Sequence, residues 1–143
     1  MFYGDDHSHK RLAREINAVS KWINRYEKIN GGNGAIAVRG LSGILVGAPV
    51  AHKLNKTLYI IRKSGENTHG RNVEILKGDK THNCYYIIDD FAASGATVQI
   101  IMTQMAGILT PAAIICYTRG TSSLAKVNGV IVFDIHTNIG KLK

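Results

Sequence analysis

Two adjacent acids stand where an apolar stretch gives way to mostly small residues. Asp89 and Asp90 follow the apolar residues 85–88, and the small residues continue to Thr97. Backbone N–H groups at the start of a helix bind anions, and Ser94 and Thr97 would add hydroxyl donors to such a site. Carboxylates repel a phosphate, but they suit sugar hydroxyls or the waters of a magnesium ion. The segment therefore predicts a sugar-phosphate site, and the alternative is an ordinary strand–turn–helix connection with a capping Asp.

Cationic side chains follow other apolar stretches. Arg39 comes directly after residues 35–38, and Lys63 follows residues 57–61 closely. Because ligands of open parallel sheets bind at the carboxyl ends of the strands, we expect these cations to lie near the acidic pair. The alternative for Arg39 is a surface arginine at a sheet edge.

The stretches that carry these residues alternate between helix and strand patterns. Apolar residues recur at spacings of three and four in residues 9–29, as in an amphipathic helix. Residues 62–80 are polar and contain three glycines, which indicates a long loop. The expected helices cover residues 9–29, 44–54 and 98–109, and the expected strands cover residues 35–38, 57–61, 85–88, 112–117 and 130–133.

This alternation predicts an α/β domain with a mostly parallel twisted sheet of about five strands and helices on both faces. The 143 residues suffice for one domain, which we expect to span residues 1–143. Residues 1–34 would form an N-terminal helix and linker. Its Trp22 and Tyr26 are expected to lie in the core or in a dimer contact.

The net charge of +8 favours anionic partners, which include phosphorylated metabolites, nucleic acid and anionic membrane surfaces. The N-terminus lacks the apolar stretch of a signal peptide, and no apolar run reaches the roughly 18 residues of a membrane span. Cys84 and Cys116 lie in apolar runs without Cys-x-x-Cys spacing, so we expect reduced thiols. The expectation is a cytoplasmic protein without a membrane partner.

Residues 85–97 resemble the signature of type I phosphoribosyltransferases of the adenine or orotate kind. That motif is an apolar strand, two acids, three small or apolar residues, Thr or Ser, Gly, any residue and Thr, and Ser94 takes the Thr/Ser place here. The resemblance implies that Asp89 and Asp90 face the ribose hydroxyls, hold Mg²⁺ through water and favour a cationic sugar in the transition state. It assigns the 5-phosphate to the backbone of Ala93, Ser94, Gly95, Ala96 and Thr97, and it counts Ala92 among the substrate-binding residues.

Residues 38–43 resemble the pyrophosphate loop of the same family, a sharp turn that often contains a non-proline cis peptide. The resemblance implies that Arg39 and Gly40 contact the leaving group. Residues 61–63 resemble the strand-end Arg-Lys pair of the family, which implies that Lys63 contacts pyrophosphate.

Residues 67–71 resemble the catalytic lid of the orotate type, which implies that His69 and Arg71 bind substrate. The lid of that type carries a lysine two residues before its histidine. Asn67 stands at this position here, and Arg71 would replace the missing cation. A solvated loop is the alternative for both residues.

The resemblance implies an enzyme, a pentosyltransferase. It would use Mg²⁺ to transfer 5-phosphoribose from phosphoribosyl pyrophosphate to a nucleobase, releasing pyrophosphate and a nucleoside monophosphate. It also implies a homodimer and a small hood over the base, formed by the N-terminal helix or by residues 118–143. Adenine, another purine, orotate and an unusual base all remain open as acceptors.

Two other interpretations remain open. Some relatives keep the donor pocket but act as non-catalytic sensors of phosphoribosyl pyrophosphate that bind nucleic acid, which the net charge of +8 would suit. A sugar-phosphate-binding α/β domain of another family would show no preference for pyrophosphorylated ribose.

Overall fold

Strands and helices alternate along the chain in the computed structural model, which describes residues 8–63, 72–90, 95–118 and 125–136. The elements are α1 (His9–Asn30), β1 (Gly34–Arg39), α2 (Gly40–Leu54), β2 (Leu58–Ile61), β3 (Val73–Leu76), β4 (Cys84–Asp89), α3 (Ala96–Met105), β5 (Thr110–Cys116), β6 (Lys126–Val127) and β7 (Val130–Asp134).

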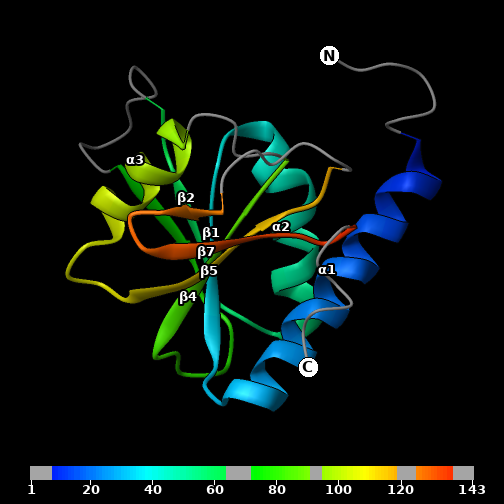
Figure 1. The fold of residues 1–143 in the computed structure, drawn as a ribbon, viewed down its shortest axis with the longest axis horizontal. Coiled ribbons are helices and arrows are strands. Elements are labelled where there is room, and N and C mark those ends of the chain that lie inside the picture. The colour runs from blue at the N-terminus through cyan, green and yellow to red at the C-terminus, as the bar shows by residue number, and fades with distance from the viewer. Residues whose placement is uncertain (1–7, 64–71, 91–94, 119–124, 137–143) are drawn as a thin grey trace.

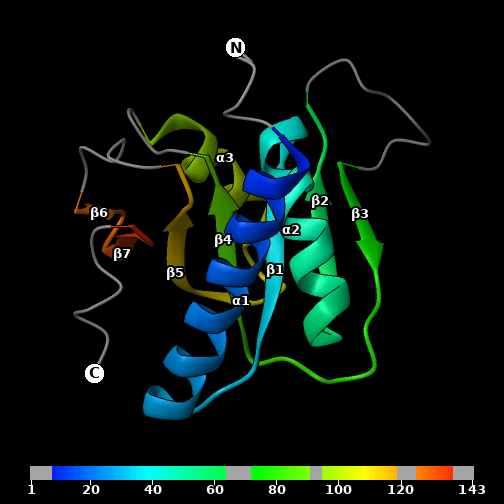
Figure 2. The same cartoon turned by 90° about the vertical axis from the view of Figure 1, so that its right-hand side faces the viewer.

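The strands form one seven-stranded sheet in the order β3-β2-β1-β4-β5-β7-β6, which Figure 2 shows from right to left. Strands β2, β1, β4, β5 and β7 run parallel, and β3 and β6 add antiparallel edges. The expected α/β class is confirmed. The expected count of about five strands matches the parallel set and misses both edge strands.

Strand β3 corrects the expectation of a continuous loop over residues 62–80. Its Val73 pairs with Ile61 of β2, and its Glu74 accepts a 2.9 Å charged hydrogen bond from Arg62. The strand has only four residues and stands at an edge, where one row of backbone groups has no neighbouring strand. Such a short, half-exposed strand leaves no clear alternation in the sequence.

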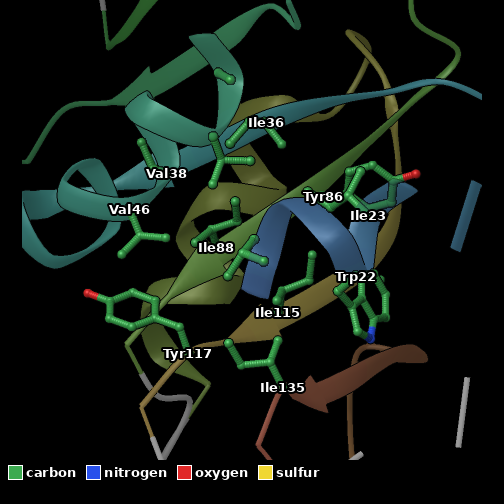
Figure 3. Close-up of a cluster of buried hydrophobic side chains, with 14 of the residues drawn as sticks. Trp22, Ile23, Ile36, Val38, Val46, Tyr86, Ile88, Ile115, Tyr117 and Ile135 are labelled. Atoms are coloured by element: carbon green, nitrogen blue, oxygen red, sulfur yellow. The ribbon is translucent and has the colours of Figure 1, made fainter. Parts of the chain in front are cut away.

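Helices α1 and α2 cover one face of the sheet and α3 covers the other, as Figure 1 shows. Successive side chains of a strand point to opposite faces. In β4, Tyr86 and Ile88 therefore pack towards α1 and α2, and Tyr85 and Ile87 pack towards α3. Figure 3 shows the larger of the two resulting clusters, which includes Trp22.

Helix α1 is part of this core. Ser8 caps its start by accepting a 3.1 Å hydrogen bond from the Arg11 N–H, and Gly31 follows its end with a φ of 77°. Trp22 is fully buried and stacks on Tyr26 with a centroid distance of 5.0 Å, so their expected place in the core is confirmed. Among the described residues, no helix is long and apolar enough to cross a membrane.

Helix α2 begins at Gly40, four residues before the expected start at residue 44. Gly40 has a φ of +80°, a conformation that glycine adopts without strain, and it turns the chain from β1 directly into the helix. Gly43 and Gly47 let the helix lie close to the sheet. A Cβ at Gly43 would lie 3.0 Å from Val38 Cβ, and a Cβ at Gly47 would overlap Val38 Cγ1.

Candidate functional site

The carboxyl ends of β2, β1 and β4 meet at one edge of the sheet, the upper edge in Figure 2. Strand β1 lies between β2 and β4 and runs parallel to both. Arg39 is the last residue of β1, Asp89 is the last residue of β4, and Lys63 stands two residues beyond β2. The structure thus brings together three segments that are far apart in the sequence.

Lys63 lies over the backbone of Gly40. A Cβ added to Gly40 would lie 3.2 Å from Lys63 Cε and 3.5 Å from Lys63 Nζ. The missing side chain at Gly40 therefore lets the lysine approach the turn between β1 and α2. The result is a cation beside the first backbone amides of α2.

Arg39 occupies the N-cap position of α2 in an extended conformation. Its Nε is buried and has no hydrogen-bond partner among the described residues. The Nε of Arg62 is in the same state, but the Nη2 of Arg62 is paired with Glu74. A buried donor without a partner is costly, and an anionic ligand would satisfy the one on Arg39. The cis peptide expected in this loop is absent, as in all described residues.

The two acids differ in their surroundings. Asp89 is only 6% exposed, whereas Asp90 is half-buried. The Oδ1 of Asp89 accepts a 2.9 Å hydrogen bond from the Asp90 N–H and a 3.4 Å hydrogen bond from the Ser42 hydroxyl. Asp90 is thus the acid that a ligand reaches more easily, and Asp89 lies beneath it.

The electrostatics of the pair oppose ionisation of Asp89. Burial is the main cause that raises the pKa of Asp89 to about 7. The hydrogen bond between the two side chains and the negative charge of Asp90 raise this pKa further. The Asp90 N–H and the Ser42 hydroxyl act in the opposite direction. A nearby cationic ligand would favour the charged form of Asp89.

Ser42 and Tyr117 support the acidic pair, a role that the sequence did not assign to either of them. The Tyr117 hydroxyl donates a 2.7 Å hydrogen bond to the Ser42 carbonyl oxygen, and burial raises the pKa of this tyrosine. The backbone N–H of Tyr117 donates to the Asp89 carbonyl oxygen at 3.2 Å. These contacts join the start of α2 to the ends of β4 and β5. The hydrogen-bonded residues are 47 and 75 positions apart in the sequence, so no local sequence pattern predicts these contacts.

Helix α3 begins shortly after the acids. Gly95 precedes it in the left-handed conformation, with a φ of 80°, and its carbonyl oxygen accepts a 2.9 Å hydrogen bond from the Gln99 N–H. The first turn of a helix presents N–H groups that lack partners within the helix. Ala96 and Thr97 stand in this turn. A helix N-terminus therefore follows the acidic pair in the chain, and helix N-termini favour anions.

Five of the predicted site residues cannot be placed in this way. His69, Arg71, Ala92, Ala93 and Ser94 lie outside the described residues. Of the other predicted residues, Arg39, Gly40 and Lys63 gather at the ends of β1 and β2, and Asp89, Asp90, Gly95, Ala96 and Thr97 follow one another from the end of β4 into α3.

Solved structures with a similar fold are phosphoribosyltransferases. Adenine phosphoribosyltransferase from Thermoanaerobacter pseudethanolicus is 20% identical with a TM-score of 0.64, and the match covers 88% of this chain and 80% of that one. Orotate phosphoribosyltransferase from Aeropyrum pernix is 18% identical with a TM-score of 0.58, covering 94% and 81%. Purine phosphoribosyltransferase from Pyrococcus horikoshii is 14% identical with a TM-score of 0.55, covering 89% of both chains.

At the level of sequence, no protein-family model matches the chain and no curated protein matches it. The structural likeness shows the fold: the chain has the phosphoribosyltransferase fold that its motif led us to expect.

Proposed function

We propose that this protein is a pentosyltransferase that transfers 5-phosphoribose from phosphoribosyl pyrophosphate to a nucleobase. The observation that carries the proposal is the gathering of two acids and two cations at the carboxyl ends of β1, β2 and β4. The acidic pair Asp89–Asp90 stands at the end of β4, and α3 starts at Ala96. The cations Arg39 and Lys63 stand at the ends of the neighbouring strands β1 and β2. A sugar flanked by a phosphate on one side and a pyrophosphate on the other matches this order of charges.

Each part of the donor has residues that suit it. The N–H groups at the start of α3, with Ala96 and Thr97, would bind the 5-phosphate, together with Ala92, Ala93 and Ser94. Asp90 would accept hydrogen bonds from the ribose hydroxyls, with Asp89 behind it. Lys63 over Gly40, and the buried Nε of Arg39, would bind the pyrophosphate. His69 and Arg71 would also bind substrate, as the resemblance to the catalytic lid implies.

Two adjacent carboxylates suit Mg²⁺, which needs only one or two protein ligands. They are too few for a metal site whose ligands all come from the protein. The described residues contain no group of three or more His, Cys, Asp or Glu side chains that would hold a metal. Mg²⁺ usually keeps several waters and binds substrate phosphates together with one or two carboxylates. Asp89 and Asp90 would hold it through water, and the ion would neutralise charge on the pyrophosphate.

In the reaction, the bond between C1 of the ribose and the pyrophosphate oxygen breaks, and the pyrophosphate leaves with the electron pair. A nitrogen of the base forms the new bond to C1 and releases its proton to the pyrophosphate or to water. Because the old bond breaks before the new bond is complete, positive charge develops on the sugar. Asp89 and Asp90 would stabilise that charge, and Arg39 and Lys63 would stabilise the leaving group. Positioning and charge would supply most of the catalysis.

A panel of bases incubated with phosphoribosyl pyrophosphate and Mg²⁺ tests the proposal, with released pyrophosphate as the readout. At least one of adenine, the other purines and orotate should give turnover. Asp90→Asn should lower that turnover at least about 100-fold, because it removes charge next to the developing cation. Asp79→Asn, an exposed aspartate in the β3–β4 connection, is the matched control and should be as active as the unchanged protein.

Absence of turnover with every base would contradict the enzyme. If the protein then still bound phosphoribosyl pyrophosphate, the non-catalytic sensor would be the better interpretation. The cytoplasmic location and the homodimer stay predictions that belong to the same proposal.

A further inference from the structure

The outer face of α1 carries a straight row of cations. Lys10, Arg14, Lys21, Arg25 and Lys28 are all exposed. At 3.6 residues per turn, they fall within about 60° of the helix circumference and span about 27 Å along its axis. Asn17 and Asn24 fill the remaining positions of this row, so the row contains neither an acid nor an apolar residue. We call these seven residues the α1 stripe.

Nothing in the described part of the chain neutralises the α1 stripe. The two acids of the helix are used elsewhere, since Glu15 pairs with Arg11 and Glu27 pairs with Lys56. The described residues provide no ion pair to any of the five cations. Lys53 of α2 widens the positive surface, because its Nζ donates a 2.6 Å hydrogen bond to Asn17 Oδ1.

The stripe also borders a shallow, open depression. It is lined by Lys21, Asn24, Arg25, Lys28 and Ile29, mostly through carbon atoms of these side chains. Like charges repel one another, so a row of cations without a counter-charge among the described residues favours an anionic partner.

The arrangement favours one kind of anionic partner. A membrane-surface helix inserts its apolar face into the bilayer, but here Val19, Trp22 and Ile23 of that face are buried in the core. A two-fold contact between copies would bring the stripe against itself and oppose like charges. Sites for single-stranded nucleic acid use exposed aromatic side chains to stack bases, and Trp22, the one tryptophan, is fully buried.

We propose that the α1 stripe binds the sugar–phosphate backbone of a nucleic-acid duplex without reading its sequence. A duplex offers a stiff row of phosphates that matches a rigid row of cations. Because the sheet lies behind α1 and α2 lies beside it, as Figure 2 shows, the outer face of the helix is the exposed one. That face would contact phosphates rather than enter a groove deeply.

This inference does not depend on the proposed transferase activity. The stripe faces away from the sheet, whereas Arg39, Lys63 and the acidic pair lie at the carboxyl ends of the strands. Duplex binding and turnover are therefore measured in separate experiments. The failure of one proposal leaves the other standing.

Fluorescence anisotropy with labelled 24-base-pair DNA and RNA duplexes tests the proposal. Five phosphate contacts predict a slope of log affinity against log salt of about −4.5, which is a loss of about 500-fold between 50 and 200 mM salt. The triple variant Lys21→Ala, Arg25→Ala, Lys28→Ala should weaken binding at least about tenfold and reduce the magnitude of that slope by about three.

The matched control is Lys77→Ala, Lys80→Ala, Lys126→Ala. It removes three exposed lysines outside α1 and lowers the net charge by the same amount. It should retain affinity within about twofold to threefold. Circular dichroism and the melting temperature establish that both variants fold.

Three results would overturn the proposal: binding of neither duplex at low salt, an equal loss in the two triple variants, or tighter binding to phosphatidylserine vesicles than to the duplexes. Binding of either duplex that depends on the stripe and not on the control lysines supports it.

Discussion

At the scale of single residues, Asp89 is an acid whose ionised form is disfavoured by its surroundings in the fold. Its backbone continues β4, its side chain is almost fully buried, and Asp90 adds a second negative charge. The acidic pair itself was predictable, because a strand followed by two acids and small residues is a local pattern. The contact from Ser42 was not, since it joins positions 47 residues apart.

The raised pKa of Asp89 predicts a pH-dependent cost to stability. The pKa rises from an ordinary 3.8 to about 7 on folding, so between these values the folded state binds more protons than the unfolded state. The free energy of unfolding should therefore fall as the pH rises from about 4 to about 7. Asp89→Asn removes this cost, and at pH 8 it should stabilise the protein by at most about 4 kcal/mol, with the gain vanishing below pH 4.

Urea unfolding of both proteins at pH 4, 6 and 8 measures this difference. Asp79→Asn, which replaces an exposed aspartate, is the control and should change the free energy of unfolding only slightly. If the free energies of unfolding of Asp89→Asn and of the unchanged protein differed by the same amount at all three pH values, the raised pKa of Asp89 would not be the cause.

At the scale of elements, the place of α2 depends on two glycines that face β1 and β4. Gly43 lies so close that a Cβ there would approach the Ile88 carbonyl oxygen to 3.1 Å, and Gly47 faces Val38 in the same way. The same helix carries Ser42 in its first turn, so its distance from the sheet sets the hydrogen bond to Asp89. Close packing here is thus a requirement of the candidate site.

Gly47→Ala should lower the free energy of unfolding by about 1–3 kcal/mol through overpacking, although alanine is the better helix former. The cost should fall by at least about 1 kcal/mol in the background of Val38→Ala, which removes the Cγ1 that the new methyl group meets. A double-mutant cycle by urea unfolding measures the coupling. Additive effects would show that the helix moves away instead.

A buried ion pair joins α1 to the opposite end of the sheet. The Oε2 of Glu27 accepts hydrogen bonds from the Lys56 Nζ at 2.8 Å, the Tyr86 hydroxyl at 2.7 Å and the Gly34 N–H at 2.7 Å. Lys56 is only 4% exposed, so the loss of its partner leaves a buried charge.

Glu27→Gln should therefore destabilise the fold by about 3 kcal/mol, because the amide keeps an acceptor oxygen but not the charge. Adding Lys56→Met should recover at least about 1 kcal/mol of that loss, since the apolar side chain needs no counter-charge. Melting curves of the two single variants and the double variant decide this. A double variant less stable than Glu27→Gln would be evidence against the pair.

The elements also mark the limit of sequence-based prediction. Helix α1 was predicted almost to its ends, because its apolar residues are regularly spaced and Gly31 follows it. The start of α2 was misplaced because glycines discourage a helix in isolation, while here tertiary packing demands them. Strand β3 was missed because antiparallel pairing to β2 holds it, and four residues carry too little pattern.

At the scale of the whole molecule, binding of the proposed donor should stabilise the fold. A ligand at about 100 times its Kd adds about 2.7 kcal/mol, which raises the Tm of a domain of this size by about 5–10 °C. Phosphoribosyl pyrophosphate with Mg²⁺ should produce this shift in a thermal melt, and ribose 5-phosphate should produce less because it lacks the pyrophosphate. The triple variant of the α1 stripe should respond like the unchanged protein, and Asp90→Asn should not. Equal shifts with both ligands would favour a general sugar-phosphate domain.

The two edge strands of the sheet, β3 and β6, differ in how readily they would start aggregation. Strand β6 has two residues and offers little backbone to another chain, whereas β3 has four and exposes Ile75 at 44% and Leu76 at 59%. Open strand margins with apolar side chains recruit further strands and begin aggregation. In concentrated samples, aggregation should therefore start at β3. Leu76→Lys should slow the growth of light scattering at high concentration without changing the Tm by more than about 2 °C, because the side chain already lies in solvent.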